Sequence, residues 1–180
     1  MRELSLHIMD IIENGISAGA DLITLEVLEK KKENLLIIKI TDNGRGIPQD
    51  ALEKVMDPFY TTRKTRRVGL GLSLFREAAK RCDGEFRLSS KEGKGTEVYA
   101  SFRMNHIDMP PIGDMAGSFS CLIMGNSKVD FVYMHEVDNK SFDIDTRHIR
   151  QELEGVPINS PEVLRHLTNT VRESLKELKS

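Results

Sequence analysis

The sequence predicts an α+β fold: a two-layer α/β sandwich, in which helices cover one face of a sheet, followed by a small C-terminal α/β unit. A stretch with helical periodicity at 3–17 precedes a pair of strand-like segments at 21–28 and 35–41, and a second pair follows at 85–90 and 96–102. Each pair is joined by a short turn, whereas parallel neighbours need a crossover of roughly a dozen residues. A doubly wound parallel sheet is therefore disfavoured.

The first predicted helix, at 3–17, has two distinct faces, because its apolar and its polar residues each recur at helical spacing. The apolar stripe consists of Ile8, Ile11, Ile12 and Ile16, and the polar stripe of Asp10, Glu13, Asn14 and Ser17. The apolar stripe is expected to pack on the sheet. The polar stripe then faces a ligand or solvent.

Two further helices are predicted between the strand pairs, a short one at 49–56 and a longer one at 72–81. Asp83-Gly84 closes the longer helix, since glycine tolerates the conformation that ends helices. Lys91–Gly95 forms the turn of the second strand pair.

Three parts are expected along the chain: a domain at 1–104, a linker at 105–117 and a unit at 118–180. The linker is rich in Met, Pro, Gly and Asp. The C-terminal unit is expected to contain strands at 118–124, 129–137 and 142–145 and a helix that begins at Ser160-Pro161-Glu162. A unit of this size is marginal for independent folding, so it is expected to dock on the first domain.

Composition excludes several classes of protein. The chain has 180 residues, 39% of them apolar, and a net charge of −2, which gives no nucleic-acid signature. No segment has the length of a membrane span, and no secretion signal precedes the first helix, so a cytoplasmic location is expected. Cys82 and Cys121 stand apart, without the spacing of a zinc site or a redox pair.

The first glycine-rich turn follows the strand at 35–41. Asp42 ends that strand, where its carboxylate could accept the exocyclic amino hydrogen of adenine, while Gly44 and Gly46 allow close approach of the backbone. The alternative is an ordinary Asp-Asn-Gly turn. A calcium-binding EF-hand loop is excluded, because Gly44 and Gly46 replace ligands and Ile47 replaces the required glycine.

The second glycine-rich turn, Gly69-Leu70-Gly71, precedes the helix at 72–81. Backbone N–H groups and the positive helix end could bind phosphate oxygens there. No Gly-Lys-Ser/Thr follows, and Leu74 replaces the third glycine of a dinucleotide fingerprint. A basic cluster precedes the turn and serves either as a phosphate contact or as a solvated loop: Arg63, Lys64, Arg66 and Arg67.

The chain resembles the GHKL superfamily of ATP-binding domains in the order of its motifs. These are a Glu-Asn pair in the first helix, the first glycine-rich turn, an Asp-Pro-Phe-Tyr-Thr-Thr loop at 57–62, the second glycine-rich turn and a downstream Gly-Lys-Gly-Thr turn. That superfamily includes sensor histidine kinases, anti-sigma-factor kinases, mismatch-repair ATPases, gyrase and Hsp90. The loop at 57–62 and the second glycine turn are closest to histidine kinases. The Glu-Asn-Gly-Ile-Ser-Ala-Gly-Ala segment at 13–20 is similar to the mismatch-repair branch.

The resemblance implies a Bergerat-type ATP-binding fold that holds ATP with Mg²⁺ under a lid at 57–68. Asn14 matches the N box and is expected to complete the Mg²⁺ shell. Phe59 matches the F box and is expected to pack under the loop or against the lid. The matched nucleotide-binding residues are Asn14, Asp42, Gly44, Gly46, Gly69, Leu70, Gly71, Leu72 and Thr96, with Lys64 as a candidate phosphate contact.

Two departures from the family bear on catalysis. A sensor kinase carries its phosphoacceptor histidine on a helical hairpin before the ATP-binding domain, but few residues precede the first helix here, and His7 lies inside that helix. In hydrolysing or serine-phosphorylating members a glutamate one turn before the asparagine acts as base. Asp10 occupies that position and is the candidate catalytic residue, with Glu13 in reserve.

Three functions remain open on the sequence alone. The first is a histidine-kinase-like protein without sensor or phosphoacceptor modules that acts in trans, as a kinase or ATP-controlled regulator of a partner that docks on 118–180. The second is a slow ATPase switch that opens and closes the lid or a homodimer. The third is a non-catalytic nucleotide-binding adaptor.

Overall fold

The structure is a computed structural model that describes residues 3–57, 59 and 71–180. It contains one six-stranded sheet in the order β3-β4-β2-β1-β5-β6. The strands are β1 (Leu22–Lys30), β2 (Leu35–Asp42), β3 (Phe86–Lys91), β4 (Gly95–Arg103), β5 (Asp130–Val137) and β6 (Lys140–Asp145). The helices are α1 (Leu4–Ser17), α2 (Gly71–Arg81), α3 (Met115–Gly125), α4 (Thr146–Glu152) and α5 (Pro161–Lys179).

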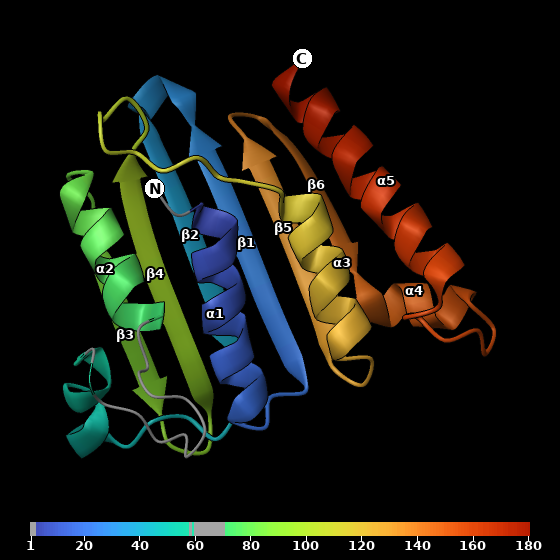
Figure 1. Ribbon diagram of the computed structural model, residues 1–180, viewed down its shortest axis with the longest axis horizontal. Coiled ribbons are helices and arrows are strands. Elements are labelled where there is room, and N and C mark those ends of the chain that lie inside the picture. Colours follow the sequence, from blue (N-terminus) through green and yellow to red (C-terminus); the bar gives the residue numbers. More distant parts are fainter. Residues whose placement is uncertain (1–2, 58, 60–70) are drawn as a thin grey trace.

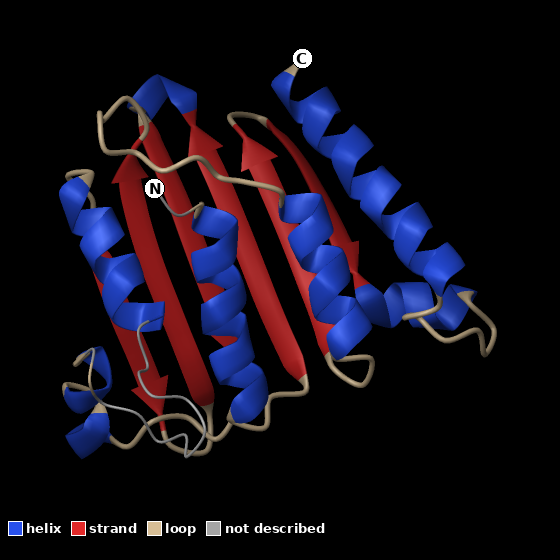
Figure 2. Ribbon diagram, viewed as in Figure 1, coloured by secondary structure: helices blue, strands red, loops and turns tan. Residues whose placement is uncertain are grey.

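Helices α1, α2, α3 and α5 lie on one face of the sheet, so the molecule has two layers (Figure 1). Figure 2 shows the same division between a red sheet and blue helices. The predicted two-layer α/β sandwich is confirmed. Strands β1 and β2 alternate between buried and half-buried residues, as expected for strands with only one covered face.

The core lies between the covered face of the sheet and the helices α1, α2, α3 and α5. On α1, Ile8, Ile11 and Ile12 are buried as predicted, whereas Ile16 is only half-buried. Phe75 of α2 is fully buried, and its ring centroid lies 5.6 Å from that of Phe102 on β4. This packing fixes α1 and α2 side by side on the sheet.

Strand pairing places the two predicted hairpins next to each other. Strand β2 pairs antiparallel with both β1 and β4, so that Asp42 lies opposite Ile23 on one side and Thr96 on the other. Strand β5 pairs parallel with β1, and β6 pairs antiparallel with β5. Residues of the C-terminal unit therefore extend the same sheet.

Two expectations about local structure are wrong. The predicted strand at 118–124 is part of helix α3, whose Asp114 accepts a hydrogen bond from the Gly117 N–H as an N-cap. The short helix at 49–56 is instead two 3₁₀ turns, Gln49–Ala51 and Lys54–Met56. A further 3₁₀ turn at Lys31–Glu33 joins β1 to β2, and α4 has no predicted counterpart.

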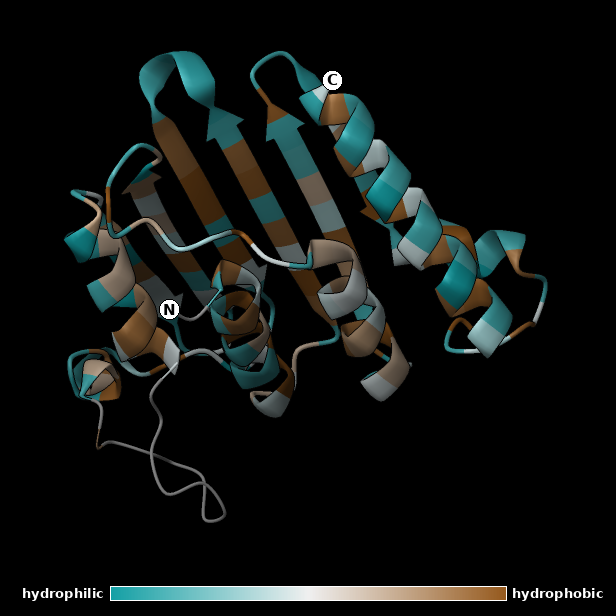
Figure 3. Ribbon diagram, turned by 45° about the horizontal axis from the view of Figure 1, so that its top comes forward, coloured by the Kyte–Doolittle hydropathy of each residue, from teal (hydrophilic) through white to brown (hydrophobic). Residues whose placement is uncertain are grey.

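Helix α5 begins at Pro161, the favoured first helical position for proline, as the sequence predicts. Figure 3 shows teal and brown residues mixed along its length, typical of a helix with one apolar face. Leu167, Val171 and Leu178 are buried on that face. None of the helices in the described part of the chain has the length and hydropathy needed to span a lipid bilayer.

Candidate nucleotide-binding site

Asp42 is the last residue of β2 and is half-buried beside the C-terminal part of α1. Its Oδ1 accepts a hydrogen bond from the Gly44 backbone N–H at 2.8 Å. Burial raises the pKa of Asp42, and hydrogen bonds from the backbone N–H groups of Gly44 and Thr96 oppose that rise. The carboxylate is thus partly desolvated, and a ligand that donates a hydrogen bond would favour its ionised form.

Gly15 is the point of closest approach between α1 and Asp42. A Cβ at Gly15 would lie 2.9 Å from the Asp42 Cβ and 3.1 Å from its Oδ2, closer than ordinary contacts. The sequence predicts no role for Gly15 in the site, because only the packing of α1 on β2 reveals this contact. Since Gly15 follows Asn14, one turn of α1 both presents Asn14 and contacts Asp42.

The N-terminus of α2 lies on the polar stripe of α1. A Cβ at Gly71, the first residue of α2, would lie 3.2 Å from the Asp10 Cβ and 3.9 Å from Asn14 Nδ2. Helix N-termini attract anions through their N–H groups and the helix dipole. Three residues predicted from separate motifs are therefore brought together at an end of a helix suited to phosphate. Leu72 is half-buried and packs against the core.

Glu13, the reserve candidate for the base, faces a different neighbour. Its Oε1 accepts a hydrogen bond from Asn126 Nδ2, just beyond α3, at 3.3 Å. Asp10 is instead the acidic residue whose Cβ lies 3.2 Å from the position that a Cβ at Gly71 would take. The geometry favours Asp10 over Glu13 as the acidic group at the N-terminus of α2.

Gly46 and Gly95 allow the turn between β3 and β4 to pack against the loop after β2. Gly46 has φ +72°, and a Cβ there would lie 2.1 Å from the Lys91 carbonyl oxygen. Gly95 has φ +111°, and a Cβ there would lie 2.0 Å from the Asp42 carbonyl oxygen. A side chain at Gly46 would displace the backbone at Lys91, and one at Gly95 would displace the backbone at Asp42.

Ser90 links this turn to the loop after β2. Its hydroxyl accepts a hydrogen bond from the Ile47 N–H at 2.8 Å and donates one to the Gly95 carbonyl at 2.9 Å. The Thr96 hydroxyl lies 2.8 Å from the Ser90 hydroxyl. The sequence gives no signal for Ser90, since its role depends on the register that pairs it with Thr96.

Other residues singled out in the sequence have structural roles, differ from their expected positions or lie outside the described residues. Asn43 Oδ1 accepts hydrogen bonds from the Asp21 and Leu22 N–H groups, both at 3.0 Å, so this side chain holds the start of β1. His7 is 5% exposed, and its ring centroid lies 6.0 Å from that of Phe75. Phe59 is 84% exposed, so the expectation that it packs under the loop or the lid is wrong. The predicted residues Lys64, Gly69 and Leu70 lie outside the described residues.

The helices lie on one face of a mixed sheet (Figure 1), and both the half-buried Asp42 at the end of β2 and the N-terminus of α2 lie against α1. This arrangement defines a two-layer α/β domain with a candidate nucleotide site. Residues 2–106 match the family described as Histidine kinase-, DNA gyrase B-, and HSP90-like ATPase. The chain belongs to this family, and membership implies ATP binding. The predicted resemblance to the GHKL superfamily is confirmed.

Histidine kinases are among the relatives by sequence. Sporulation kinase C of Bacillus subtilis (strain 168) is 34% identical over 94 residues, which cover 52% of this chain and 22% of that protein. The sensor histidine kinase WalK of the same strain is 36% identical over 96 residues, or 49% of this chain and 16% of that protein. The chain therefore matches about a fifth of the length of these relatives.

Solved structures show the same fold at low sequence identity. The Aquifex aeolicus MutL ATPase domain complexed with ADP matches with a TM-score of 0.51 at 13% identity, covering 86% of this chain and 68% of that one. The N-terminal domain of a DNA repair protein matches with a TM-score of 0.52 at 16% identity, covering 81% and 52%. These matches support the fold alone.

Proposed function

We propose that the chain binds ATP with Mg²⁺ at this site and acts in trans, as a kinase or an ATP-controlled regulator of a partner protein. One observation carries the proposal. The end of β2 that holds Asp42 and the N-terminus of α2 both lie against a single helix, α1, through Gly15 and Gly71. A base-recognising carboxylate and a phosphate-binding helix end would thus act on the same nucleotide.

The adenine end of the site is assigned to Asp42, which would accept a hydrogen bond from the exocyclic amino group. This contact selects adenine over guanine, whose ring carries a carbonyl oxygen at that position. Gly44 and Gly46 would leave room for the base, and the Thr96 hydroxyl, already held by Ser90, would bind the ring edge through water.

The phosphate end is assigned to Gly71 and Leu72, whose backbone N–H groups lie at the start of α2. The sequence adds Lys64, Gly69 and Leu70 as further phosphate contacts. Asn14 would supply one oxygen to Mg²⁺. This donor set fits Mg²⁺, which is typically held by one or two protein ligands, water and substrate phosphates. Consistently, the described residues contain no cluster of three metal-ligating side chains.

The positions of the histidines support transfer to another protein. His7 and His135 are buried at 5% and 0% exposure, so neither is accessible to a γ-phosphate. His148 lies on α4 and His166 on α5, at the opposite edge of the sheet from α2 (Figure 1). His106 is half-buried and follows β4, beyond the end of that strand that is opposite to Asp42. Positioning and neutralisation of charge by the site would carry most of a phosphoryl transfer. The unit at 118–180 is proposed as the surface that receives the partner.

Incubation with Mg²⁺ and γ-labelled ATP tests this proposal. The expected result is saturable binding of ATP, with neither labelled protein nor free phosphate after several hours. Binding should be weakened in Asp42→Asn and retained in the control Glu13→Gln, whose carboxylate faces Asn126. Absence of ATP binding, or label on the chain itself, would refute the proposal.

The second candidate is a slow ATPase switch, and the contact between Asp10 and Gly71 favours it. If the N-terminus of α2 binds the phosphates, the Asp10 carboxylate would act as the base that activates water. Slow release of phosphate that is lost in Asp10→Asn and kept in Glu13→Gln would support this function over transfer to a partner. Release that persists in Asp10→Asn would exclude Asp10 as the base.

A further inference from the structure

A cleft of about 530 Å³ lies at the other end of the sheet, between β6, α4 and α5. Its floor is apolar and is formed by residues from all three elements: Ile144, Ile149, Leu153, Val163 and Leu167. Its size falls within the roughly 300–1,000 Å³ range typical of ligand sites in proteins. None of the motifs assigned to the nucleotide contributes to it.

The cleft opens at the edge of the sheet. Strand β6 is last in the strand order, and among the described residues it pairs only with β5. Three successive residues of β6, Asp143, Ile144 and Asp145, line the cleft. Successive strand residues point to opposite faces, so a cleft lined by all three reaches around the outer edge of the strand. The edge backbone of β6 is therefore within reach of a bound chain.

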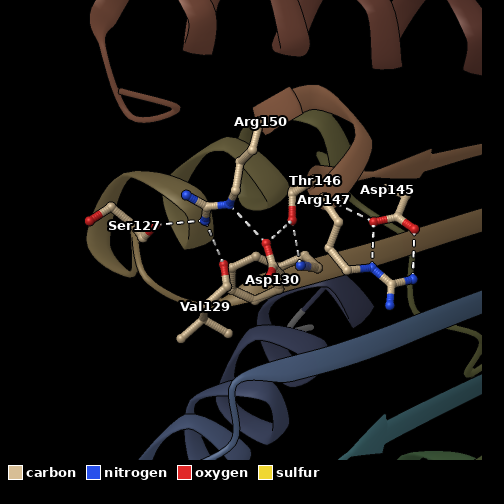
Figure 4. Close-up of polar contacts among 8 residues, drawn as sticks. Ser127, Val129, Asp130, Asp145, Thr146, Arg147 and Arg150 are labelled. Atoms are coloured by element: carbon tan, nitrogen blue, oxygen red, sulfur yellow. Dashed lines mark hydrogen bonds and ion pairs between the residues drawn. The ribbon is translucent and has the colours of Figure 1, made fainter. Parts of the chain in front are cut away.

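The polar rim of the cleft is acidic. Four carboxylates line it, Asp143, Asp145, Glu152 and Glu162, together with His148, His166 and Thr170, and no lysine or arginine is among its described lining residues. The two arginines of α4 are directed to other partners (Figure 4): Arg147 Nη2 lies 2.7 Å from Asp145 Oδ2, and Arg150 Nε lies 2.8 Å from Asp130 Oδ1. Asp145 is thereby neutralised.

The other three carboxylates, Asp143, Glu152 and Glu162, are exposed and form no ion pair within the described part of the chain. They surround an apolar floor, and the charge that complements them is positive. An apolar floor with an acidic rim and a strand edge matches three properties of an extended peptide: apolar side chains, basic side chains and unpaired backbone groups.

We propose that this cleft binds a short basic segment of a partner protein, with alternating apolar and basic side chains, along the edge of β6. The apolar side chains lie on Ile149, Leu153 and Leu167, and the basic ones lie near Glu152 and Glu162. This inference rests on the proposed function in one respect, because the basic segment is taken to belong to the partner protein on which the chain is proposed to act. Binding of the segment itself requires no nucleotide.

The test uses the full chain labelled with ¹⁵N and a fluorescent octapeptide of alternating lysine and valine. We expect saturable binding that shifts the amide signals of 143–153 and 162–170. Glutamine at both Glu152 and Glu162 should weaken binding about fivefold, the effect of two exposed ion pairs. Glutamine at both Glu173 and Glu177, also exposed on α5 but outside the cleft, should leave affinity unchanged.

Two further probes distinguish a site for an extended peptide from a site for small cations. A lysine–serine octapeptide should bind more weakly than the lysine–valine peptide, because the floor of the cleft is apolar. Equal binding of the two peptides, or displacement of the peptide by spermidine at similar concentration, would overturn the inference in favour of a site for small cations. Amide shifts outside the cleft, or self-association of the chain through it, would also overturn it.

Binding of ATP is measured on the same samples. Retained ATP binding with no peptide binding at the cleft would overturn the docking inference and leave the nucleotide site intact. Peptide binding at the cleft by a chain that does not bind ATP would support the docking inference and refute the proposed function. The two failures are therefore distinguishable.

Discussion

Asp42→Asn separates the role of Asp42 in recognition from its effect on stability. The substitution removes the charge but keeps an oxygen that can accept the Gly44 N–H bond, now 2.8 Å long. The carboxylate that would accept a hydrogen bond from the adenine amino group becomes an uncharged amide. A hydrogen bond to a charged group contributes about 1.5–3 kcal/mol. Loss of this contact should therefore raise the Kd for ATP roughly 10- to 150-fold.

The same substitution should stabilise the free protein at pH 7. Burial raises the pKa of Asp42, against the hydrogen bonds from Gly44 and Thr96. For a group with a raised pKa, the stability it contributes is present below the unfolded value of about 3.9 and is lost as pH rises through the folded value. At pH 7 the ionised carboxylate thus costs stability, and asparagine removes that cost.

Calorimetric titration with ATP and thermal unfolding at pH 7 and about pH 3.5 test both parts. Asp42→Asn should bind ATP more weakly and have the higher Tm at pH 7, with the difference reduced in acid. Asp50→Asn, which changes an exposed carboxylate on the same loop, should behave like the parent chain. Unchanged ATP affinity in Asp42→Asn would refute the adenine assignment. A lower Tm at pH 7 would refute the argument from burial.

Three further substitutions test the fold around the two sites. Gly95→Ala should lower the free energy of unfolding by about 2 kcal/mol or more in urea titration, since its Cβ would meet backbone. Gly93→Ala also places a Cβ at positive φ but has open space around it, so it should cost less. Glu29→Gln should reduce the decrease in Tm that accompanies a fall in pH. Burial raises the Glu29 pKa, but the His135 hydrogen bond and nearby lysines bring it below its usual value, so its stabilisation is present at neutral pH and is lost as pH falls. Asp114→Ala should cost about 1 kcal/mol by removing the N-cap of α3, again measured by urea unfolding.

The residues of the candidate nucleotide site could be proposed from sequence to the extent that they lie in short local motifs. The pattern of α1 placed Asp10 and Asn14 on one polar stripe, and the end of a buried strand identified Asp42. The contacts through Gly15 and Ser90 could not be predicted, because each depends on residues distant in the chain. Local periodicity predicts the helices and strands, whereas the packing of these elements determines which side chains contact one another.

The segment at 118–124 shows where local reasoning failed. Its apolar residues alternate with serines near the start, which favours a strand. In the structure the same segment is helical, because Asp114 caps it and the buried residues have helical spacing on the sheet: Met115, Ala116, Phe119, Leu122 and Ile123. The cap, Asp114, lies before this segment, in the stretch predicted to be a linker. The parallel pairing of β5 with β1 is a contact between distant parts of the chain, which no local pattern encodes.

Hydrogen bonds connect the loop that follows Asp42 to α4, the helix beside the acidic cleft. Asn43 Oδ1, in the loop after β2, accepts from the Asp21 N–H at 3.0 Å, and the Asp21 carbonyl accepts from the Asp130 N–H at 2.8 Å. Asp130 Oδ1 in turn accepts from the Thr146 hydroxyl at 3.0 Å and from Arg150 Nε at 2.8 Å, and both residues belong to α4, which lines the cleft (Figure 4). If ATP and the peptide both bias this set of contacts, thermodynamic linkage requires that each change the affinity of the other by the same factor. Measuring the Kd of the lysine–valine peptide with and without ATP, and that of ATP with and without peptide, gives this factor twice, and a value of one would show that the cleft and the nucleotide site act independently.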